Sequence, residues 1–449
     1  MNRVSELIIA VSPLVLILHG CDGDNPESPA NEPPVITSSP AQQVTEDLMF
    51  IFVVEFEDAD GPDTIITYSE IPSWLAVSAD TVSGVPGDND TDTSFVVAVS
   101  DGLDADTLMV QLTVLAVNDP PVLQVEDTSY ASGGIDYTFR PQISDPDNES
   151  VTITFPHVPS WVTVQADSVY GNPSDTASDD FITVIASDGE LADTAEVYIC
   201  VMPPLAVYGD SRTGHDAHTR VVGQIMEVHP AVVFHSGDLV EDGTDQSDWD
   251  MFNTITADMR AEAEFFPALG NHELQSQLFF DNFELPGNEQ WYSVIRNRVL
   301  FIVLNSCVEI GPASVQYQWL EDELQAVDDS VWYIAVIFHH PPYSTGYHYL
   351  ECTYYRTMLV PVFEEYGVDI VFNGHDHDYE RSFCGGIYYI VAGGGGAPLR
   401  DQASSYICSQ LFLKQYHFCK VSVLPDRIVV KTIDDLGEQS DQFEVSASP

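Results

Sequence analysis

The chain has 449 residues and an extreme charge, because 71 acidic residues oppose 14 basic ones for a net of −57. One hydrophobic core does not serve a chain of this length, so roughly two to four domains are expected. The apolar and aromatic content excludes a disordered chain. The negative charge argues against binding to nucleic acid or to an anionic membrane surface.

The N-terminus has the pattern of an export signal over residues 1–21. Arg3 precedes the apolar run Leu7–Leu18, which is too short to cross a bilayer but suits a signal peptide. The run ends in Leu18-His-Gly-Cys21, which resembles the cleavage and acylation box of bacterial lipoproteins. We therefore expect an exported protein of the cell envelope, periplasmic or extracellular, that meets a membrane only through a lipid anchor at Cys21. The alternative is an ordinary cleaved signal.

An internal repeat follows a polar segment, residues 22–34, that we interpret as a flexible linker. Asn31-Glu-Pro-Pro-Val35 recurs as Asn118-Asp-Pro-Pro-Val122, an offset of 87 residues (122 − 35). The same offset relates four further pairs: Asp58-Ala-Asp60 and Asp145-Pro-Asp147, Pro72-Ser-Trp74 and Pro159-Ser-Trp161, Gly84 and Gly171, and Ser100-Asp-Gly102 and Ser187-Asp-Gly189. We therefore predict two copies of one module, at residues 35–118 and 119–204.

Each copy is predicted to be a small β-sandwich. Short β-branched stretches such as Phe95–Ser100 and Phe181–Ser187 are bounded by Asp and Gly turns, and no helical period is present. The pair resembles bacterial cadherin-like, immunoglobulin-type repeats, whose junctions carry a linker of the kind seen at Val117-Asn-Asp-Pro-Pro121. We expect the repeats to act as a stalk, with Trp74 and Trp161 in their cores.

Acidic turns in the repeats leave two interpretations open. Asp58, Asp60, Asp119, Asp145 and Asp147 offer the hard oxygen ligands that Ca²⁺ prefers. Turns rich in Asp on a solvated acidic surface explain the same residues equally well.

The second half, residues 205–449, is predicted to be an α/β domain, because apolar strands alternate with amphipathic helices. The charge changes at the same boundary. Between Asp22 and Pro204 lie 34 acidic residues and one basic residue, Arg140, whereas 36 acidic and 12 basic residues follow. The helices are expected at His218–His229, Gln316–Val327 and Arg356–Tyr366.

Five predicted strands each end at a polar segment. They are Leu205–Tyr208 before Gly209-Asp210, Ala231–His235 before Gly237-Asp238, Phe265–Leu269 before Gly270-Asn-His-Glu273, Val331–Phe338 before His339-His-Pro-Pro-Tyr343, and Val368–Phe372 before Gly374-His-Asp-His-Asp-Tyr-Glu-Arg381. Sheets of α/β domains build their sites at such strand ends. Carboxylates, an amide and imidazoles together suit Fe, Mn or Zn. Two such ions can share a hydroxide and hold both oxygens of a displacement at phosphorus.

From about residue 205 to 400, the chain resembles the calcineurin-like metallophosphoesterase superfamily and its purple acid phosphatase-like branch. The resemblance implies a four-layer α/β/β/α sandwich. It implies a binuclear hydrolase of phosphate mono- or diesters, in small molecules or polymers, that acts through a metal-bridging hydroxide. His339 is preferred to His340 because the family's ligand lies two residues before the Pro, here Pro341. The implied ligands are Asp210, Asp238 (bridging both metals), Asn271, His339, His375 and His377.

Three residues are candidates for contact with the substrate. His272 matches a His of the family that contacts phosphate, and His348 matches a His that protonates the leaving alcohol. Arg212 is a candidate for binding substrate phosphate, although a surface Arg that answers acidic neighbours explains it nearly as well.

Two departures from the family affect the first metal. Purple enzymes have a Tyr three residues after the bridging Asp, where this chain has Glu241, so purple colour is expected to be absent. Many other members have a His two residues after the first Asp, where this chain has Arg212. The first metal therefore lacks its usual extra protein ligand unless Glu241 or water supplies it.

Two alternative functions remain beside an acid phosphatase-like enzyme. The first is an extracellular nucleotidase or another phosphodiesterase, which differs only in the loops that line the pocket. The second is a surface adhesion or calcium-binding protein with an inactive phosphoesterase fold, against which the complete ligand set argues.

Six cysteines follow Cys21, and export makes disulfides possible. No pair has the CxxC spacing of a structural zinc site. Cys307 and Cys352 both follow predicted strands, so we predict a bridge between them.

Overall fold

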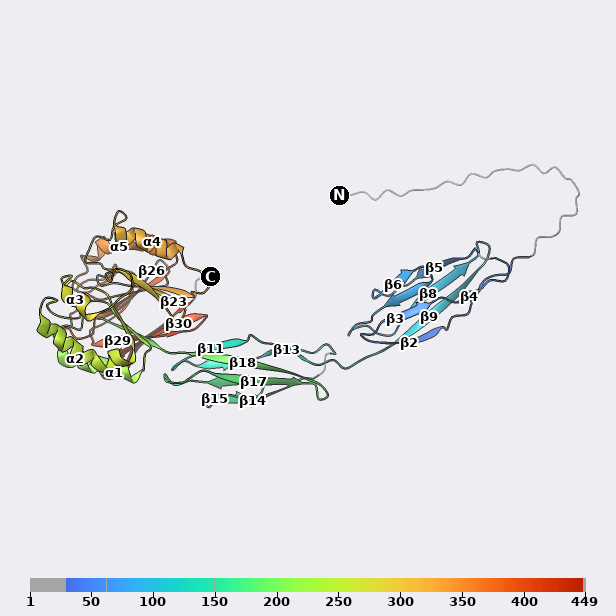
Figure 1. Cartoon of the computed structure of the whole chain (residues 1–449), viewed down its shortest axis with the longest axis horizontal. Helices are drawn as coiled ribbons and strands as arrows, with labels where there is room; N and C mark the ends of the chain where they lie inside the picture. The colour runs from blue at the N-terminus through green and yellow to red at the C-terminus, as the bar shows by residue number, and fades with distance from the viewer. Residues whose placement is uncertain (1–29, 62, 148–149, 447–449) are drawn as a thin grey trace, which may run out of the picture. The chain divides into compact units, whose positions relative to one another are not determined.

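The computed structural model describes residues 30–61, 63–147 and 150–446. Its contacts divide the chain into two compact units (Figure 1). One unit contains the residues up to Asp119 together with 146–148, and the other contains Pro120–Asp145 and the chain from residue 149 onward. The predicted signal peptide, Cys21 and most of the predicted linker lie outside the described residues. No helix in the described ranges is long and apolar enough to cross a membrane.

The first repeat is a sandwich of two antiparallel-rich sheets. Its strands are β1 (Val35–Ile36), β2 (Ala41–Thr45), β3 (Phe50–Val53), β4 (Phe56–Glu57), β5 (Ile65–Ser69), β6 (Leu75–Ser78), β7 (Thr81–Gly84), β8 (Thr93–Ser100) and β9 (Ala105–Leu115). Four strands pair in the order β2-β9-β8-β5, three in the order β3-β7-β6, and β1 pairs with β4. Phe95, Val97 and Val99 alternate inward along β8 and are fully buried between the sheets.

The second repeat has the same arrangement. Its strands are β10 (Val122–Gln124), β11 (Thr128–Ser132), β12 (Tyr137–Phe139), β13 (Gln142–Ser144), β14 (Thr152–His157), β15 (Val162–Gln165), β16 (Ser168–Gly171), β17 (Asp180–Ser187) and β18 (Ala192–Met202). They pair as β11-β18-β17-β14, β12-β16-β15 and β10-β13, which repeats the first order strand by strand. Trp74 and Trp161 both pack against their sandwich cores. The residue limits of the two modules stay predictions.

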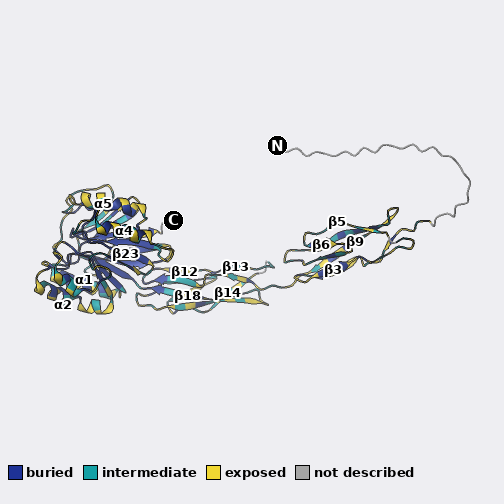
Figure 2. Cartoon of the chain, turned by 45° about the horizontal axis from the view of Figure 1, so that its top comes forward, coloured by how far each residue is buried: buried dark blue, intermediate teal, exposed yellow. Residues whose placement is uncertain are grey.

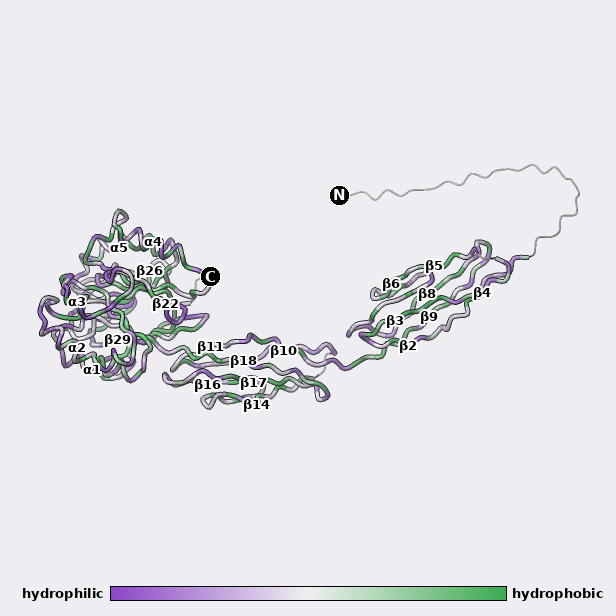
Figure 3. Tube along the Cα trace, viewed as in Figure 1, coloured by the Kyte–Doolittle hydropathy of each residue, from purple (hydrophilic) through white to green (hydrophobic). Residues whose placement is uncertain are grey.

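One hydrogen bond between an Asp side chain and a backbone amide occurs at the equivalent position in each copy. Asp106 Oδ2 accepts from the amide of Ile36 at 2.8 Å, and Asp193 Oδ2 accepts from the amide of Leu123 at 2.8 Å. Both partners are offset by 87 residues (123 − 36 and 193 − 106). Green hydrophobic stretches follow the strands of both copies in Figure 3, as the alternating pattern requires.

The C-terminal domain contains two large sheets. The first consists of β19 (Leu205–Tyr208), β20 (Val232–His235), β21 (Glu264–Pro267), β29 (His417–Val423), β30 (Arg427–Asp434) and β31 (Gln439–Ser446). The second consists of β22 (Tyr292–Arg296), β23 (Val299–Val303), β24 (Tyr333–Ile337), β25 (Ile370–Asn373), β26 (Tyr379–Cys384), β27 (Ile387–Ala392) and β28 (Ser409–Leu413). Their orders are β21-β20-β19-β29-β30-β31 and β22-β23-β24-β25-β27-β26-β28.

Helices cover the outer faces of these sheets. They are α1 (His215–Glu227), α2 (Gln246–Glu262), α3 (Gln277–Asn282), α4 (Val315–Gln325) and α5 (Cys352–Glu365). In Figure 1, α1 and α2 lie on one side of the two sheets and α4 and α5 on the other. Val221 and Ile225 of α1 pack on β19 and β20, whereas Leu320 of α4 and Phe363 of α5 pack on β23 and β24.

A continuous apolar core joins the two sheets. Val207 and Phe234 from the first sheet meet Phe301 and Ile337 from the second in one cluster. Figure 2 shows these inner strands in dark blue, with yellow exposed positions on the helices. The predicted four-layer α/β/β/α sandwich is therefore confirmed.

The predicted elements have slightly different ends. Helix α1 begins at His215, three residues before its predicted start, and α5 begins at Cys352, four residues before. The five predicted strands are β19, β20, β21, β24 and β25, and they are split between the two sheets.

The predicted Cys307–Cys352 disulfide is wrong. Both thiols are free, and the disulfide found among the described cysteines joins Cys384 to Cys408, with 5.5 Å between their Cα atoms. The reason lies in the pairing of β26 with β28. The amide of Phe383 donates to the carbonyl of Cys408 at 2.9 Å, which brings the two half-cystines opposite each other.

Candidate metal centre

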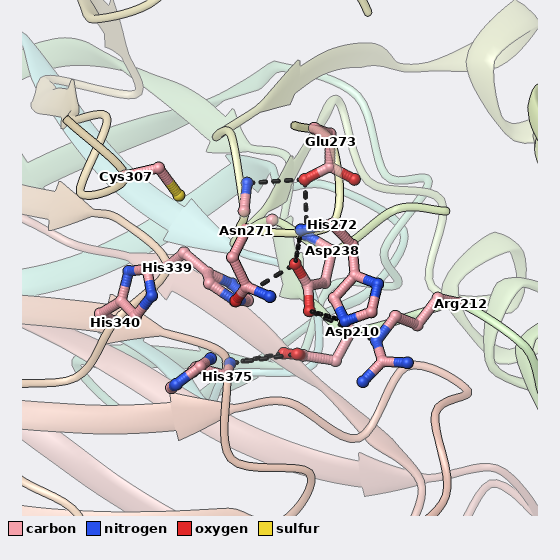
Figure 4. Close-up of polar contacts among 12 residues, drawn as sticks. Asp210, Arg212, Asp238, Asn271, His272, Glu273, Cys307, His339, His340 and His375 are labelled. Atoms are coloured by element: carbon pink, nitrogen blue, oxygen red, sulfur yellow. Dashed lines mark hydrogen bonds and ion pairs between the residues drawn. The ribbon is translucent and has the colours of Figure 1, made fainter. Parts of the chain in front are cut away.

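The ends of five strands converge on one cluster of polar side chains (Figure 4). β19, β20 and β21 deliver residues from the first sheet, and β24 and β25 deliver residues from the second. The residues brought together include all six predicted ligands: Asp210, Asp238, Asn271, His339, His375 and His377.

The backbone at this cluster adopts conformations that most residues avoid. Asp210, Asp238 and His375 have φ angles of 55°, 59° and 72°. Such left-handed residues each carry a strain of about 1–3 kcal/mol and concentrate at functional sites. Gly374 is required for close approach, since a Cβ there would lie 2.3 Å from Asp210 Oδ2.

His339 lies at the centre of the predicted second metal site. Its Nδ1 donates to the carbonyl of Ser236 at 3.0 Å, which leaves the lone pair on Nε2. That Nε2 lies 3.1 Å from Asn271 Oδ1 and 3.3 Å from Asp238 Oδ1. A carbonyl-anchored imidazole with two oxygens beside its free nitrogen suits a metal ligand set.

His375 is held by a carboxylate that the sequence did not single out. Its Nε2 donates to Glu351 Oε2 at 3.1 Å, so its Nδ1 keeps the lone pair. The other oxygen of Glu351 accepts from His348 Nδ1 at 3.0 Å. The rings of His348 and His375 are 4.0 Å apart. The structure therefore brings His348 into the centre and adds Glu351, which orients two histidines at once.

The predicted first metal site contains Asp210 and His377. His377 Nδ1 donates to the carbonyl of Pro398 at 2.9 Å, and its Nε2 lies 3.7 Å from Asp210 Oδ1. Asp210 also accepts from the amide of His375 at 2.9 Å. A loop of four successive glycines, residues 393–396, crosses close by, since a Cβ on Gly393 would lie 2.9 Å from Asp210 Oδ2.

Arg212 lies inside this first site rather than on the surface. Its Nε is 3.3 Å from Asp238 Oδ2, its Nη2 is 3.4 Å from His377 Nε2, and its Nη1 donates to Glu241. Its side chain is 11% exposed. Figure 4 shows the guanidinium beside Asp210 and Asp238. The interpretation of Arg212 as a surface charge is therefore wrong, because its planar group is packed among the candidate ligands.

His272 borders the same cluster. Its amide donates to Asp238 Oδ1 at 3.0 Å, and its Nε2 lies 3.9 Å from Asp238 Oδ2. Its ring Nδ1 donates to the carbonyl of Glu241. The side chain is 24% exposed, so a ligand can reach it.

Glu273 is a second functional carboxylate that the sequence did not single out. It accepts from the amides of Gly270 and Asp238 with Oε2 and from the amide of Leu239 with Oε1. It thereby fixes the loop after β20 to the loop after β21. Burial, and then the charge of Asp238, raise the pKa of Glu273 to about 7.

The two aspartates at the centre have opposite pKa shifts. Burial raises the pKa of Asp210 well above its usual range. Burial opposes ionisation of Asp238 too, but the charge and hydrogen bond of His339 lower its pKa overall. Burial lowers the pKa of His339, but the charge and hydrogen bond of Asp238 raise it to about 9 overall, so a metal that binds at Nε2 displaces a proton from that nitrogen. Of these two carboxylates, Asp238 is therefore the one that more readily keeps its negative charge.

His340 lies beside the candidate centre, but its ring already contacts Ser306 and Tyr355. Its Nδ1 shares a hydrogen bond with Ser306 Oγ at 2.8 Å, and its ring stacks on Tyr355 at 4.8 Å. Burial, and then the charge of His339, lower its pKa to about 3. It stays neutral, close to His339 and His375.

The donors present fit one implied metal better than the other. Around His339, the carboxylate, amide and imidazole donors suit a borderline ion, and each anchored imidazole keeps a free nitrogen. Around His377, similar donors are present, but a guanidinium lies among them.

Residues 203–379 match the sequence model of the calcineurin-like phosphoesterase family. This range therefore carries a calcineurin-like phosphoesterase domain. It begins two residues before β19 and ends at the first residue of β26, so it contains all five strand ends that meet at the cluster.

Curated relatives point to one branch of that family. The chain is 30% identical over 176 residues to purple acid phosphatase 15 of Arabidopsis thaliana, which covers 34% of this chain and 33% of the relative. It is 31% identical over 181 residues to the Fe(3+)-Zn(2+) purple acid phosphatase 12 of the same plant, covering 36% and 38%. This chain thus spans about a third of the length of these relatives.

A solved structure shares the fold. The purple acid phosphatase from yellow lupin (Lupinus luteus) seeds superposes with a TM-score of 0.50 over 92% of this chain and 95% of its own, at 15% identity. At that identity the likeness concerns the fold alone.

Acidic side chains also gather in the first repeat. Asp58, Asp60 and Asp101 form one group, and Asp47, Asp88 and Asp119 form another, with one carboxylate oxygen from each residue within 4.8 Å of the others in its group. Of the predicted calcium residues, Asp58, Asp60 and Asp119 thus lie in acidic groups. Calcium binding stays a prediction.

Proposed function

We propose that this chain is a binuclear metal-dependent phosphoesterase that hydrolyses phosphate mono- or diesters, in the manner of acid phosphatases. The observation that carries the proposal is the set of three anchored imidazoles, of which His339 lies beside Asp238, His377 beside Asp210 and His375 next to His339. Each imidazole donates one nitrogen to a fixed oxygen and keeps the other for a metal. The match of this region to phosphoesterases supports the same conclusion.

Each polar residue has a proposed part in the reaction. Bound metal ions would polarise the phosphoryl oxygens and supply a nucleophile at neutral pH. Asp238 turns one oxygen to His339 and the other to the first site, so it is the candidate bridge. His272, exposed beside Asp238, would donate to the phosphate. His348, anchored by Glu351, would donate a proton to the leaving alcohol.

The substrate class stays open within phosphate esters. Small-molecule and polymer esters both fit a centre on strand ends, and a nucleotidase or another phosphodiesterase would use the same centre. The net charge of −57 argues against nucleic acid as a partner.

A non-catalytic role as an adhesion or calcium-binding protein is the second candidate. The acidic groups of the first repeat favour it, and the complete ligand set argues against it. Export and a lipid anchor at Cys21 are further proposals, supported by the apolar run Leu7–Leu18 that ends shortly before Cys21.

Removal and return of metal test the proposal. Purified protein stripped with a chelator should lose turnover of p-nitrophenyl phosphate and bis(p-nitrophenyl) phosphate. Turnover should return after loading with Mn, Fe or Zn, and the ratio of the two rates would separate monoesterase from diesterase. Protein that stays inert with both esters after every loading would contradict the proposal and favour adhesion.

A further inference from the structure

The guanidinium of Arg212 occupies the place where the first metal would find its ligands. Its nitrogens contact one oxygen of Asp238 and the free Nε2 of His377. Because His377 Nδ1 donates to Pro398, Nε2 is the nitrogen of this ring that can accept, and Arg212 Nη2 lies 3.4 Å from it. The arginine therefore uses the same lone pair that a metal would use.

Charge gives the same result as geometry. Asp210 and Asp238 are both buried, and two buried carboxylates this close need a nearby cation. In this structure two cations lie beside Asp238, the His339 imidazole at Oδ1 and the Arg212 guanidinium at Oδ2, and Arg212 is the one on the side of the first site. A guanidinium and a metal dication at the same oxygen and nitrogen would repel each other strongly in a site with little water.

We propose that Arg212 and the first metal ion are alternative occupants of one site, so that this chain binds the second metal tightly and the first weakly. The inference deepens the proposed phosphoesterase function and rests on it. It predicts sequential loading, with the second site, around His339, filled before the first.

The structure also provides a place for the side chain when the metal enters. Arg212 lines a cavity of about 260 Å³ together with Thr213, Glu241 and Asp248. Glu241 already accepts a hydrogen bond from Arg212 Nη1 and is half exposed. The guanidinium can therefore move outward and keep an acidic partner.

Among the residues that the structure describes, no arginine or lysine forms a hydrogen bond or ion pair with His339 or Asn271 of the candidate second site. His339 Nε2 lies beside Asn271 Oδ1 and Asp238 Oδ1, and both of these atoms are of metal ligand types. Arg212 thus separates the two sites by affinity although their donor atoms are alike.

The test measures metal stoichiometry rather than activity alone. Wild-type protein and the variants Arg212→Gln and Arg212→His are stripped, titrated with Mn²⁺ or Zn²⁺ by calorimetry, and analysed for bound metal after dialysis. Wild type should bind one metal equivalent tightly, at the second site around His339, and another at least tenfold more weakly, at the first site around His377. Both variants should bind metal at the first site at least tenfold more tightly than wild type, with the affinity of the second site unchanged.

A matched control is available on the same face of the domain. Arg220 of α1 pairs with Asp435 and is half exposed, so Arg220→Gln removes one arginine charge without touching the ligands. It should leave both affinities at the wild-type values. Paramagnetic resonance of the Mn²⁺-loaded proteins gives a second readout, because coupled pairs should appear at lower metal concentration in the Arg212 variants.

Other outcomes would separate this inference from the proposed function. Two equally tight equivalents in active wild type would overturn the inference and leave the phosphoesterase intact. Variants that change only KM, with unchanged metal affinity, would overturn it in favour of Arg212 as a phosphate ligand. Wild type that binds no metal and cleaves no ester would overturn both.

Discussion

Glu351 fixes two histidines at the candidate centre, although it is itself half exposed. One of its oxygens accepts from His348 and the other from His375. A carboxylate behind a metal-ligating histidine sets the tautomer and raises the basicity of the ring. Glu351 is therefore a positioning residue for both the second metal and the proposed proton donor.

The substitution Glu351→Gln should lower turnover and second-site metal affinity by about 10–100-fold. An amide keeps the shape but does not accept from both rings with equal strength. Calorimetric titration of the stripped protein, beside steady-state kinetics, checks this. Glu309→Gln is the control, since Glu309 accepts a weak hydrogen bond from Tyr354 away from the ligands. Wild-type metal affinity in Glu351→Gln would show that the contact is incidental.

The sequence predicted that the six candidate ligands lie together but not which groups orient them. The candidates follow strand ends at family spacings, and the structure brings them into one cluster. Glu351 and Glu273 carry no such signal, because a single Glu near a motif is common and its partners are set by tertiary packing. The orientation of the Arg212 side chain is set by its contacts with Asp238 and Glu241. Sequence spacing does not predict these contacts.

At the scale of elements, strand β29 illustrates why part of the fold was not predicted. All seven of its residues are buried, yet His417, Lys420 and Ser422 interrupt its apolar pattern. Lys420 is accommodated by an ion pair with Asp175 of the second repeat, a partner 245 residues away in the sequence. The earlier strands β19 and β20 have no polar residue before their last position, and both were predicted.

His417 in β29 should make the domain sensitive to acid. Burial lowers its pKa to about 4, although its hydrogen bond to the carbonyl of Gln415 opposes the shift. Between pH 6.5 and 4 the unfolded chain binds a proton that the native state does not, so stability falls as pH falls in that window. The loss reaches about 3 kcal/mol at the lower end.

Chemical denaturation at several pH values checks this. His417→Asn should flatten the decline in the free energy of unfolding between pH 6.5 and 4.5. His229→Asn, at an exposed histidine, should keep the wild-type slope. Equal slopes in wild type and His417→Asn would refute the assignment of acid sensitivity to His417.

At the scale of the whole molecule, the sequence predicted the modules but not how the second repeat packs. Within the second unit, Tyr130 of the repeat meets Trp332 of the C-terminal domain edge to face at 4.8 Å, and Ile135 packs with Leu424 and Val429. These contacts depend on surfaces far apart in sequence. The repeat itself could be recognised from the sequence, because its short motifs recur at one constant offset.

The net charge of −57 should make stability depend on salt. Repulsion among carboxylates disfavours the compact state, and KCl screens it, since the Debye length falls from about 10 Å at 0.1 M to about 3 Å at 1 M. We expect Tm to rise by a few degrees over that range. A falling Tm would contradict this. Ca²⁺ at equal ionic strength should raise the melting of the repeats further only if their acidic groups bind it.

The most direct measurement is turnover of p-nitrophenyl phosphate by metal-loaded wild type and by Asp238→Asn. Asp238 contacts both sites, so its amide should remove at least about 99% of activity while the fold persists. Asp216→Asn, on the exposed first turn of α1, should stay fully active. An Asp238→Asn protein as active as wild type would contradict a metal centre built on Asp238.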